Sequence, residues 1–330
     1  MGKVGRLAIV GFGSIGRRHL RLIKQLHSDI EVVLVRSGKG EGCQEEAMAY
    51  LSVESADEAI KVGIDAAIIS SPASNHLRDA GYFLAEKIPL LIEKPLSNNL
   101  DGINQFKLLV DKIKVPVLVG YVLRYSEAAR YFYKLVSSEK AGKLHYANIK
   151  CSSFLPDWRP GKDYRISVSS KESLGGGVLN ELSHELDYAN WFFGPFRSVN
   201  ASLKNSGILG IEVEDKAKIM FYTLANAPIS VSLDFSCQTN NRITILYGSK
   251  GTITWDAINQ VVRFESTTGQ VEQKIFVSTR DDIYLAQLVN FFECIEKKNF
   301  TNKSLCDGIS VLNLINAARQ SNAKKEFINL

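Results

Sequence analysis

The stretch Val10-Gly11-Phe12-Gly13-Ser14-Ile15-Gly16 follows a short apolar run and opens an amphipathic segment. In such a stretch the first glycine permits a tight turn, the second lets the backbone approach a diphosphate, and the third allows close helix-to-strand packing. The helix that begins here offers unpaired N–H groups and the positive end of its dipole to an anion. We therefore predict a dinucleotide-binding loop formed by Gly11, Gly13, Ser14, Ile15 and Gly16.

Around this loop, apolar runs alternate with amphipathic stretches. The expected strands are Arg6–Val10, Glu31–Val35, Asp65–Ser70, Pro89–Glu93 and Val115–Tyr121. The expected helices are Ile15–His27, Ser55–Val62, Asn75–Lys87 and Asn99–Lys114. Near-continuous apolar strands that alternate with helices indicate a parallel sheet covered on both faces, the doubly wound Rossmann plan. We assign this domain to residues 1–122.

After Tyr121 the pattern changes to strands with period-two alternation. These are expected at Val213–Thr223, Ala227–Cys237, Ile243–Trp255, Val261–Ser266 and Val271–Val277, and closing helices at Ile283–Lys297 and Leu305–Arg319. We expect residues 123–330 to form an α/β domain with a large open, mainly antiparallel sheet.

Composition excludes several classes of protein. The chain has 330 residues, of which 45% are hydrophobic, so two domains can each bury a core. Its 40 Lys and Arg against 35 Asp and Glu fall far short of a nucleic-acid-binding balance, and no apolar stretch reaches the ~20 residues of a membrane helix. The five cysteines are scattered without zinc-site spacing. We expect a cytoplasmic protein with no metal site and no nucleic-acid or membrane partner.

The residues directly after the second expected strand are those that would contact the ribose 2′ position of the cofactor. An NAD site usually carries Asp or Glu about 20 residues after the loop. Here the chain reads Val35-Arg36-Ser37-Gly38-Lys39 instead. Arg36, Ser37 and Lys39 would receive a 2′-phosphate through charge-assisted hydrogen bonds, the alternative being a solvated loop. The sequence favours NADP(H), with NAD(H) possible.

Glu93-Lys94-Pro95 lies at the end of the fifth expected strand. Ligands of doubly wound sheets bind outside the carboxyl ends of the strands. A lysine there is suited to exchanging a proton with a substrate hydroxyl, and Glu93 could orient it. We predict Lys94 as a catalytic residue, with a solvated loop as the alternative.

The segment from Gly175 to Gly194 is expected to form one helix with an apolar stripe. Its opposite face carries Asn180, Glu181, His184, Asp187 and Tyr188. A histidine with a carboxylate three residues to either side is suited to acid–base work near neutral pH, the alternative being a hydrogen-bonded structural histidine.

The long connection from Pro156 to Gly177 is typical of a binding loop. Trp158 and Tyr164 can stack on a sugar or nicotinamide face, while Arg159, Lys162 and Arg165 could hold a carboxylate or diphosphate. The alternative is an ordinary polar loop.

Further motifs join these features in the same order: Ser71-Pro72…His76, Gly120-Tyr121…Arg124-Tyr125 and Gly248–Ile253. Together they resemble the Gfo/Idh/MocA family of oxidoreductases over nearly the whole chain. The resemblance implies a Rossmann domain and a sheet domain that often forms the oligomer interface, so we expect a homo-oligomer, either a dimer or a tetramer. It also implies that Lys94 and His184 are catalytic, with the substrate between them and the nicotinamide.

The same resemblance implies the other contacts. Cofactor contacts are expected at Ser71, Pro72, His76, Glu93 and Lys94, and substrate contacts at Arg124, Trp158, Arg159, Tyr164, Asn180, His184 and Asp187. Many members have an aspartate four residues before the histidine, where this chain has Asn180. Glu181 lies on the same helical face, so either Glu181 or Asn180 completes the catalytic set.

The expected activity is hydride transfer between NAD(P) and a secondary hydroxyl or ketone of a sugar or nucleotide sugar. The Leu-Ser-His-Glu-Leu-Asp form at 182–187 resembles a subgroup found with bacterial surface-sugar biosynthesis. One alternative is a redox-neutral epimerase or glycosidase with tightly bound NAD. Another is a nucleotide-responsive regulator, which the presence of both Lys94 and His184 disfavours.

Overall fold

The computed structural model describes residues 4–38 and 42–330, and the chain divides into two compact units. The first unit comprises residues up to Val122 together with Thr279–Leu312, and the second comprises Leu123–Ser278 and Asn313–Leu330. The segment Thr279–Leu312 thus packs with the first unit, whereas the expected division at residue 122 assigned it to the second domain. Among the described residues no helix is long and apolar enough to cross a membrane.

The first unit contains a six-stranded parallel sheet in the order β3-β2-β1-β4-β5-β6. Its strands are β1 (Arg6–Val10), β2 (Glu31–Val35), β3 (Leu51–Val53), β4 (Ala66–Ile69), β5 (Leu90–Ile92) and β6 (Val117–Val119). This confirms the doubly wound plan. Strand β3 was not expected, because it is short, lies at the edge of the sheet and lacks the buried apolar run of the other five.

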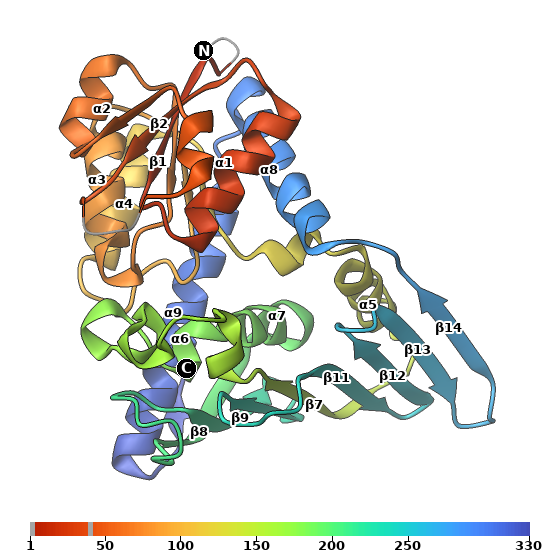
Figure 1. Ribbon diagram of the computed structural model, residues 1–330. Coiled ribbons are helices and arrows are strands. Elements are labelled where there is room, and N and C mark those ends of the chain that lie inside the picture. Colours follow the sequence, from red (N-terminus) through yellow and green to blue (C-terminus); the bar gives the residue numbers. More distant parts are fainter. Residues whose placement is uncertain (1–3, 39–41) are drawn as a thin grey trace. The chain divides into compact units, whose positions relative to one another are not determined.

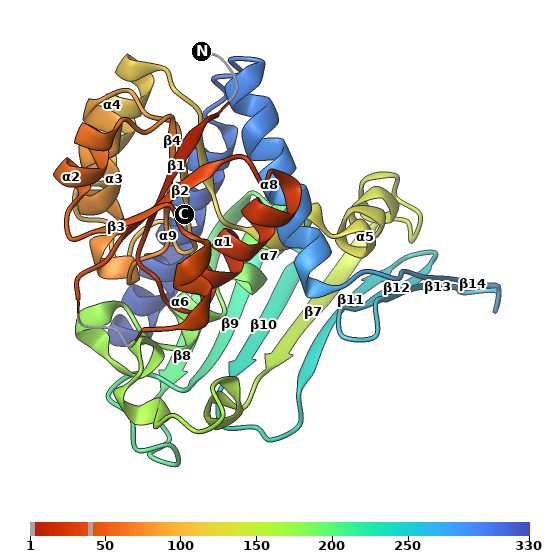
Figure 2. The same cartoon turned by 45° about the horizontal axis from the view of Figure 1, so that its top comes forward.

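Helices cover both faces of this sheet. They are α1 (Ser14–Leu26), α2 (Ala56–Val62), α3 (His76–Ala85), α4 (Ile103–Ile113) and α8 (Arg280–Glu296). Helices α2, α3 and α4 lie on one face, and α1 and α8 lie side by side on the other (Figures 1 and 2). Helix α8 buries Leu288 and Phe291 in the same apolar cluster as Leu20 and Ile23 of α1. This packing explains why the chain returns to the first unit after residue 278.

The second unit contains a nine-stranded sheet in the order β14-β13-β12-β11-β7-β10-β9-β8-β15. The strands are β7 (Leu144–Ser152), β8 (Phe196–Lys204), β9 (Lys216–Thr223), β10 (Pro228–Asp234), β11 (Asn241–Gly248), β12 (Gly251–Asp256), β13 (Val261–Ser266), β14 (Val271–Ile275) and β15 (Ile328–Asn329). The β7–β10 pair is parallel and the other described pairs are antiparallel, which confirms the mainly antiparallel sheet. Strands β7, β8 and β15 were not expected.

Helices α5 (Glu127–Ser137), α6 (Val178–Glu181) and α7 (His184–Phe193) pack against one face of this sheet (Figure 1). The connection after β7 forms four short 3-10 turns, η4 (Leu155–Trp158), η5 (Tyr164–Ile166), η6 (Val168–Ser170) and η7 (Glu172–Leu174). Helix α9 (Lys303–Lys324) begins in the first unit and ends in the second.

The expected single helix from Gly175 to Gly194 was wrong, because the chain breaks at Leu182 and Ser183 between α6 and α7. A count of 100° per residue holds only along a continuous helix, so the break resets which side chains share a face. Tyr188, expected on the polar face, is buried with its ring 5.2 Å from that of Trp255 in an edge-to-face contact.

A buried ion pair ties α7 to the sheet. Nε of Arg242 on β11 donates to Oε1 of Glu185 at 2.6 Å, and its Nη2 donates to Oε2 at 3.1 Å. Glu185 is completely buried, whereas the Arg242 side chain is 25% exposed. Burial and the nearby Glu185 carboxylate raise the pKa of the Cys151 thiol well above its usual value, so Cys151 stays neutral beside the pair. Each charge therefore depends on the other for compensation.

We expect Arg242→Met to lower the free energy of unfolding by about 3 kcal/mol, because it leaves the Glu185 carboxylate buried without its partner. Glu185→Met should cost a similar amount, and the double variant should cost less than the sum of the two. Urea denaturation measures all three. As a control, Arg263→Met removes an ion pair with Glu265 that is about half exposed, and should cost at most ~1 kcal/mol. Additive costs at positions 185 and 242 would contradict the coupling.

Candidate functional site

The glycine loop leaves one face of the α1 N-terminus open. Gly11 has a φ of 86°, and a Cβ there would lie 2.6 Å from the backbone nitrogen of Ser71. A Cβ on Gly16 would overlap the carbonyl oxygen of Gly11. Gly13, by contrast, is exposed, and a Cβ there would meet no atom within 4 Å. Two glycines thus serve internal packing, and the third keeps the backbone accessible.

The start of α1 suits an anion. Gly13 is the N-cap residue, no side chain caps the helix, and the first turn contains no acidic residue. Ser14 is exposed and Ile15 half-buried beside it. The first N–H groups of a helix have no partner within the helix and carry partial positive charge. The loop therefore fits the diphosphate of a dinucleotide.

His76 connects two strand ends of the first unit. Its ring is buried, with Nε2 2.8 Å from the carbonyl oxygen of Ser71 and Nδ1 2.8 Å from that of Pro95. The Ser71 hydroxyl donates to Asp79 at 2.7 Å, and Pro72 precedes the short turn η2 (Ala73–Asn75). The expected cofactor contacts Ser71 and His76 thus belong to one hydrogen-bonded group beside the glycine loop, and Pro72 directly follows Ser71.

Glu93 is buried at the end of β5 and pairs with a residue that the sequence analysis missed. Its Oε1 lies 2.7 Å from Nε2 of His19 on α1, and its Oε2 accepts a 3.3 Å hydrogen bond from the backbone N–H of Lys94. Burial opposes ionisation, but the hydrogen bond from His19 and the charges of His19 and Lys94 hold the pKa of Glu93 below its ordinary value. Lys94 itself is half-buried, and its peptide bond to Pro95 is cis.

His19 carried a signal in the sequence. It shares the buried face of α1 with Leu22 and Ile23, and its imidazole is fully buried there, edge-on to Tyr284 of α8 at 5.8 Å. A polar residue on an apolar helical stripe needs a buried partner. No local pattern names that partner, because Glu93 lies 74 residues away.

The residues expected to contact a 2′-phosphate, at the end of β2, differ from one another in their surroundings. Ser37 is exposed, and Lys39 lies outside the described residues. Arg36 is partly buried and forms an ion pair with Glu46 of the turn η1 (Gln44–Met48). Its guanidinium carbon lies 5.8 Å from the ring centroid of Phe12 in the glycine loop. Glu46 was missed because the segment around it has no regular apolar period.

In the second unit, Asn180 and Glu181 hold the chain that precedes His184. Asn180 is buried and donates from Nδ2 to the carbonyl oxygens of Gly175 at 3.0 Å and Gly176 at 3.3 Å. Oε1 of Glu181 accepts a 2.9 Å hydrogen bond from the Ser169 hydroxyl. His184 is the first residue of α7 and is partly exposed.

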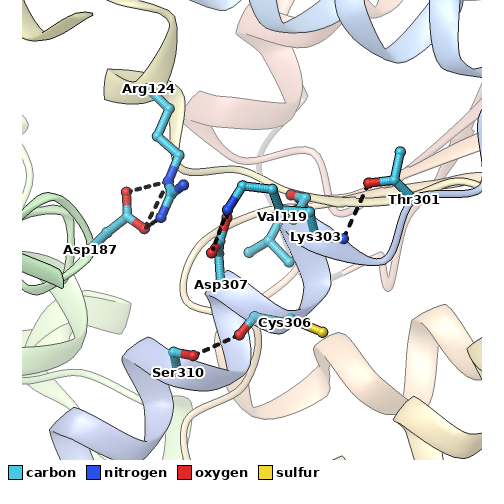
Figure 3. Close-up of polar contacts among 9 residues, drawn as sticks. Val119, Arg124, Asp187, Thr301, Lys303, Cys306, Asp307 and Ser310 are labelled. Atoms are coloured by element: carbon cyan, nitrogen blue, oxygen red, sulfur yellow. Dashed lines mark hydrogen bonds and ion pairs between the residues drawn. The ribbon is translucent and has the colours of Figure 1, made fainter. Parts of the chain in front are cut away.

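Asp187 is buried and binds Arg124 of the turn η3 (Val122–Tyr125). Nε of Arg124 lies 3.0 Å from both carboxylate oxygens, and Nη2 donates to Oδ1 at 2.8 Å (Figure 3). The guanidinium carbon also lies 5.5 Å from the Trp191 ring centroid. The carboxylate expected to influence His184 is therefore balanced by an arginine.

The polar atoms of the expected sugar-stacking residues bond to the protein. Nε1 of Trp158 donates to the Ser153 hydroxyl at 2.8 Å, and the Tyr164 hydroxyl donates to the carbonyl oxygen of Leu209 at 3.0 Å. Both side chains remain partly exposed, and Arg159 is exposed. These hydrogen bonds hold both side chains within the loop, and the Trp158 ring also lies edge-on to that of Phe235 at 5.2 Å.

Two family models match the chain and together cover most of it. Residues 5–121 match the NAD-binding Rossmann fold of an oxidoreductase family, and residues 134–330 match the C-terminal alpha/beta domain of the same family. The chain belongs to the Gfo/Idh/MocA family of oxidoreductases. This confirms the family expected from the sequence and identifies the protein as an enzyme with an NAD-binding Rossmann domain.

Relatives in this Gfo/Idh/MocA family span nearly the full chain. Inositol 2-dehydrogenase of Rhizobium meliloti (strain 1021) is 25% identical over 340 residues, 98% of this chain and 99% of the relative. Myo-inositol 2-dehydrogenase of Thermotoga maritima is 25% identical, covering 98% of each chain. A solved structure of levoglucosan dehydrogenase in complex with NADH and levoglucosan has the same fold, with a TM-score of 0.87, 17% identity and coverage of 98% of each chain.

The three loop glycines should respond differently to alanine. Gly13→Ala should lower the free energy of unfolding of the protein without cofactor by at most ~1 kcal/mol, because its Cβ enters open space. The same substitution should weaken NADH and NADPH binding at least about tenfold, because the Cβ blocks the approach of the diphosphate. Gly11→Ala should destabilise the fold itself by about 2 kcal/mol, because of its positive φ and the contact with Ser71. Thermal denaturation and fluorescence titration separate the two effects. Wild-type affinity in Gly13→Ala would contradict the assignment.

Proposed function

We propose that this enzyme is a dehydrogenase or reductase that transfers a hydride between a nicotinamide dinucleotide and a secondary hydroxyl or ketone of a sugar or sugar derivative. The observation that carries the proposal is the position of Lys94, one residue beyond the buried Glu93, at the carboxyl end of a Rossmann strand. Relatives named as inositol and levoglucosan dehydrogenases support the substrate class.

The chain's own contribution is proton transfer and positioning. The nicotinamide, when bound, supplies the hydride chemistry. In oxidation the Lys94 amine takes the hydroxyl proton as the carbonyl forms, and in reduction the ammonium returns it. Glu93 holds the backbone N–H of Lys94, and His19 holds Glu93, so the lysine starts from a fixed strand end.

Roles in catalysis and substrate binding are also proposed for residues of the second unit. His184 is the second acid–base residue, and Glu181 or Asn180 positions the segment before it. Arg124, Trp158, Arg159 and Tyr164 are the proposed substrate contacts, and Asp187, which is buried, positions Arg124. Arg159 is exposed and Trp158 and Tyr164 are partly exposed, and an aromatic side chain can stack on a sugar face.

We also propose that the cofactor is NADP(H) in preference to NAD(H), through Arg36 and Ser37. The absence of an acid directly after β2 and the place of Arg36 beside Phe12 support this choice. Fluorescence titration should give tighter binding of NADPH than of NADH. Tight NADH binding without an NADPH response would contradict it.

Three expectations stay predictions from sequence. They are a place in bacterial surface-sugar biosynthesis, a nucleotide sugar as the substrate, and a cytoplasmic location. We do not propose the redox-neutral or regulatory alternatives, because no contact described above favours either of them.

Lys94→Ala and His184→Ala should each lower kcat by roughly 10²–10⁴-fold, because a positioned acid–base group is lost. Turnover is followed by NAD(P)H absorbance with inositols, anhydrosugars, free sugars and sugar nucleotides. Lys112→Ala, which removes an exposed lysine from α4, is the control and should match wild type. Near-wild-type turnover of Lys94→Ala on the best substrate would refute the assignment.

We propose that the second sheet forms a homo-oligomer through the face opposite its helices. Ala147 and Leu246 are buried, whereas the adjacent Tyr146 is 41% exposed and Tyr247 is partly exposed. Successive residues of a strand face opposite sides, so the two tyrosines lie on the other face, where their rings stack at 4.2 Å across β7 and β11. Exposed aromatic residues on an open sheet face suit contact with a second copy of the chain.

The double variant Tyr146→Asp/Tyr247→Asp should therefore shift the protein toward the monomer, because it places two charges on the contact face. Size-exclusion chromatography with light scattering measures the mass. Leu108→Asp, at a residue 68% exposed on α4, is the matched control and should leave the mass unchanged. A monomeric wild type at micromolar concentration, or an unaltered mass in the double variant, would contradict the interface.

A further inference from the structure

An acidic residue stands beside the proposed 2′-phosphate position, although none directly follows β2 in the sequence. Glu46 lies ten residues after Arg36 on the turn η1, and the two side chains form an ion pair. The Arg36 side chain is 17% exposed and that of Glu46 27% exposed. Both charges therefore remain within reach of a ligand while they bind each other.

The ion pair lies next to the glycine loop. The backbone N–H of Arg36 donates to the carbonyl oxygen of Val53 on β3 at 2.9 Å, which fixes where the residue leaves the sheet. Its guanidinium carbon lies 5.8 Å from the ring centroid of Phe12, the residue between Gly11 and Gly13. The turn η1 also packs against α1. The charged groups thus adjoin the loop that suits the diphosphate.

The turn itself holds the Glu46 carboxylate in place. Oε1 of Glu46 accepts a 3.0 Å hydrogen bond from the backbone N–H of Cys43, the N-cap residue of η1. A carboxylate with a local backbone donor keeps its position when a neighbouring side chain moves. This hydrogen bond and the ion pair together hold the Glu46 carboxylate beside Arg36.

We propose that Glu46 is a specificity-determining residue for the adenosine ribose of the cofactor, an inference that rests on the proposed binding of a nicotinamide dinucleotide. Its carboxylate accepts a hydrogen bond from a ribose 2′-hydroxyl but repels a 2′-phosphate, and it neutralises the arginine that would bind that phosphate. Glu46 thus reduces the NADP(H) preference that Arg36 and Ser37 would otherwise give.

The test compares four variants by fluorescence titration with NADPH and with NADH. Glu46→Gln should raise the ratio of NADPH to NADH affinity by about tenfold over wild type, because it removes the negative charge that neutralises Arg36 and would repel a 2′-phosphate. Glu46→Lys should raise the ratio further, and Arg36→Ala should lower it below the wild-type value. Glu45→Gln removes the same charge from the neighbouring residue and should leave the ratio within about twofold of wild type.

Melting curves of the proteins without cofactor establish that each variant is folded, because loss of a partly exposed ion pair costs little. The inference is overturned if folded Glu46→Gln and Glu46→Lys change the affinity ratio no more than Glu45→Gln does. Failure of the wild type to bind either dinucleotide would instead refute the proposed function. The two failures are distinct, because the first requires measurable binding and the second requires its absence.

Discussion

The first unit depends on a close backbone approach at the glycine loop. Gly11 lies so near Ser71 that a Cβ would be 2.6 Å from its nitrogen, and Gly16 leaves equally little room at the Gly11 carbonyl. From Ser71 the contacts continue through the His76 ring to Pro95, and from Glu93 through His19 back to α1. The result is a closed series of contacts from the loop to Lys94 and back. These contacts hold the cofactor loop and the backbone of Lys94 in place in the structure without ligand.

The second unit depends on the pairing of its buried carboxylates with positively charged or hydrogen-bonding side chains. Each acidic residue around His184 has a partner. Glu181 accepts a hydrogen bond from Ser169, Glu185 pairs with Arg242, and Asp187 pairs with Arg124. Buried carboxylates without partners would destabilise the fold, so the start of α7 is set by pairs that reach other elements. The histidine consequently lies in a balanced electrostatic environment and not beside isolated negative charges.

Much of the architecture was predictable from the sequence. The parallel sheet, the glycine loop and the mainly antiparallel second sheet were expected, because apolar periodicity and glycine spacing are local properties. Strands β3 and β15 were not, since two or three residues carry too little pattern. The break between α6 and α7 was missed because assigning helix faces from residue spacing assumes one continuous helix. Lys94 and His184 were selected from their motifs, and their roles stay proposals.

The sequence by itself determined the family, the order of the elements and the residue types present at each strand end. Only the tertiary structure decided which of those residues meet. His19 meets Glu93, Glu46 meets Arg36, Arg242 meets Glu185, and α8 returns to the first unit to pack on α1. The physical reason is that a buried charge or an apolar helix face must find a partner in space. Chain separation does not restrict that partner, so local patterns reveal the need for it but not its identity.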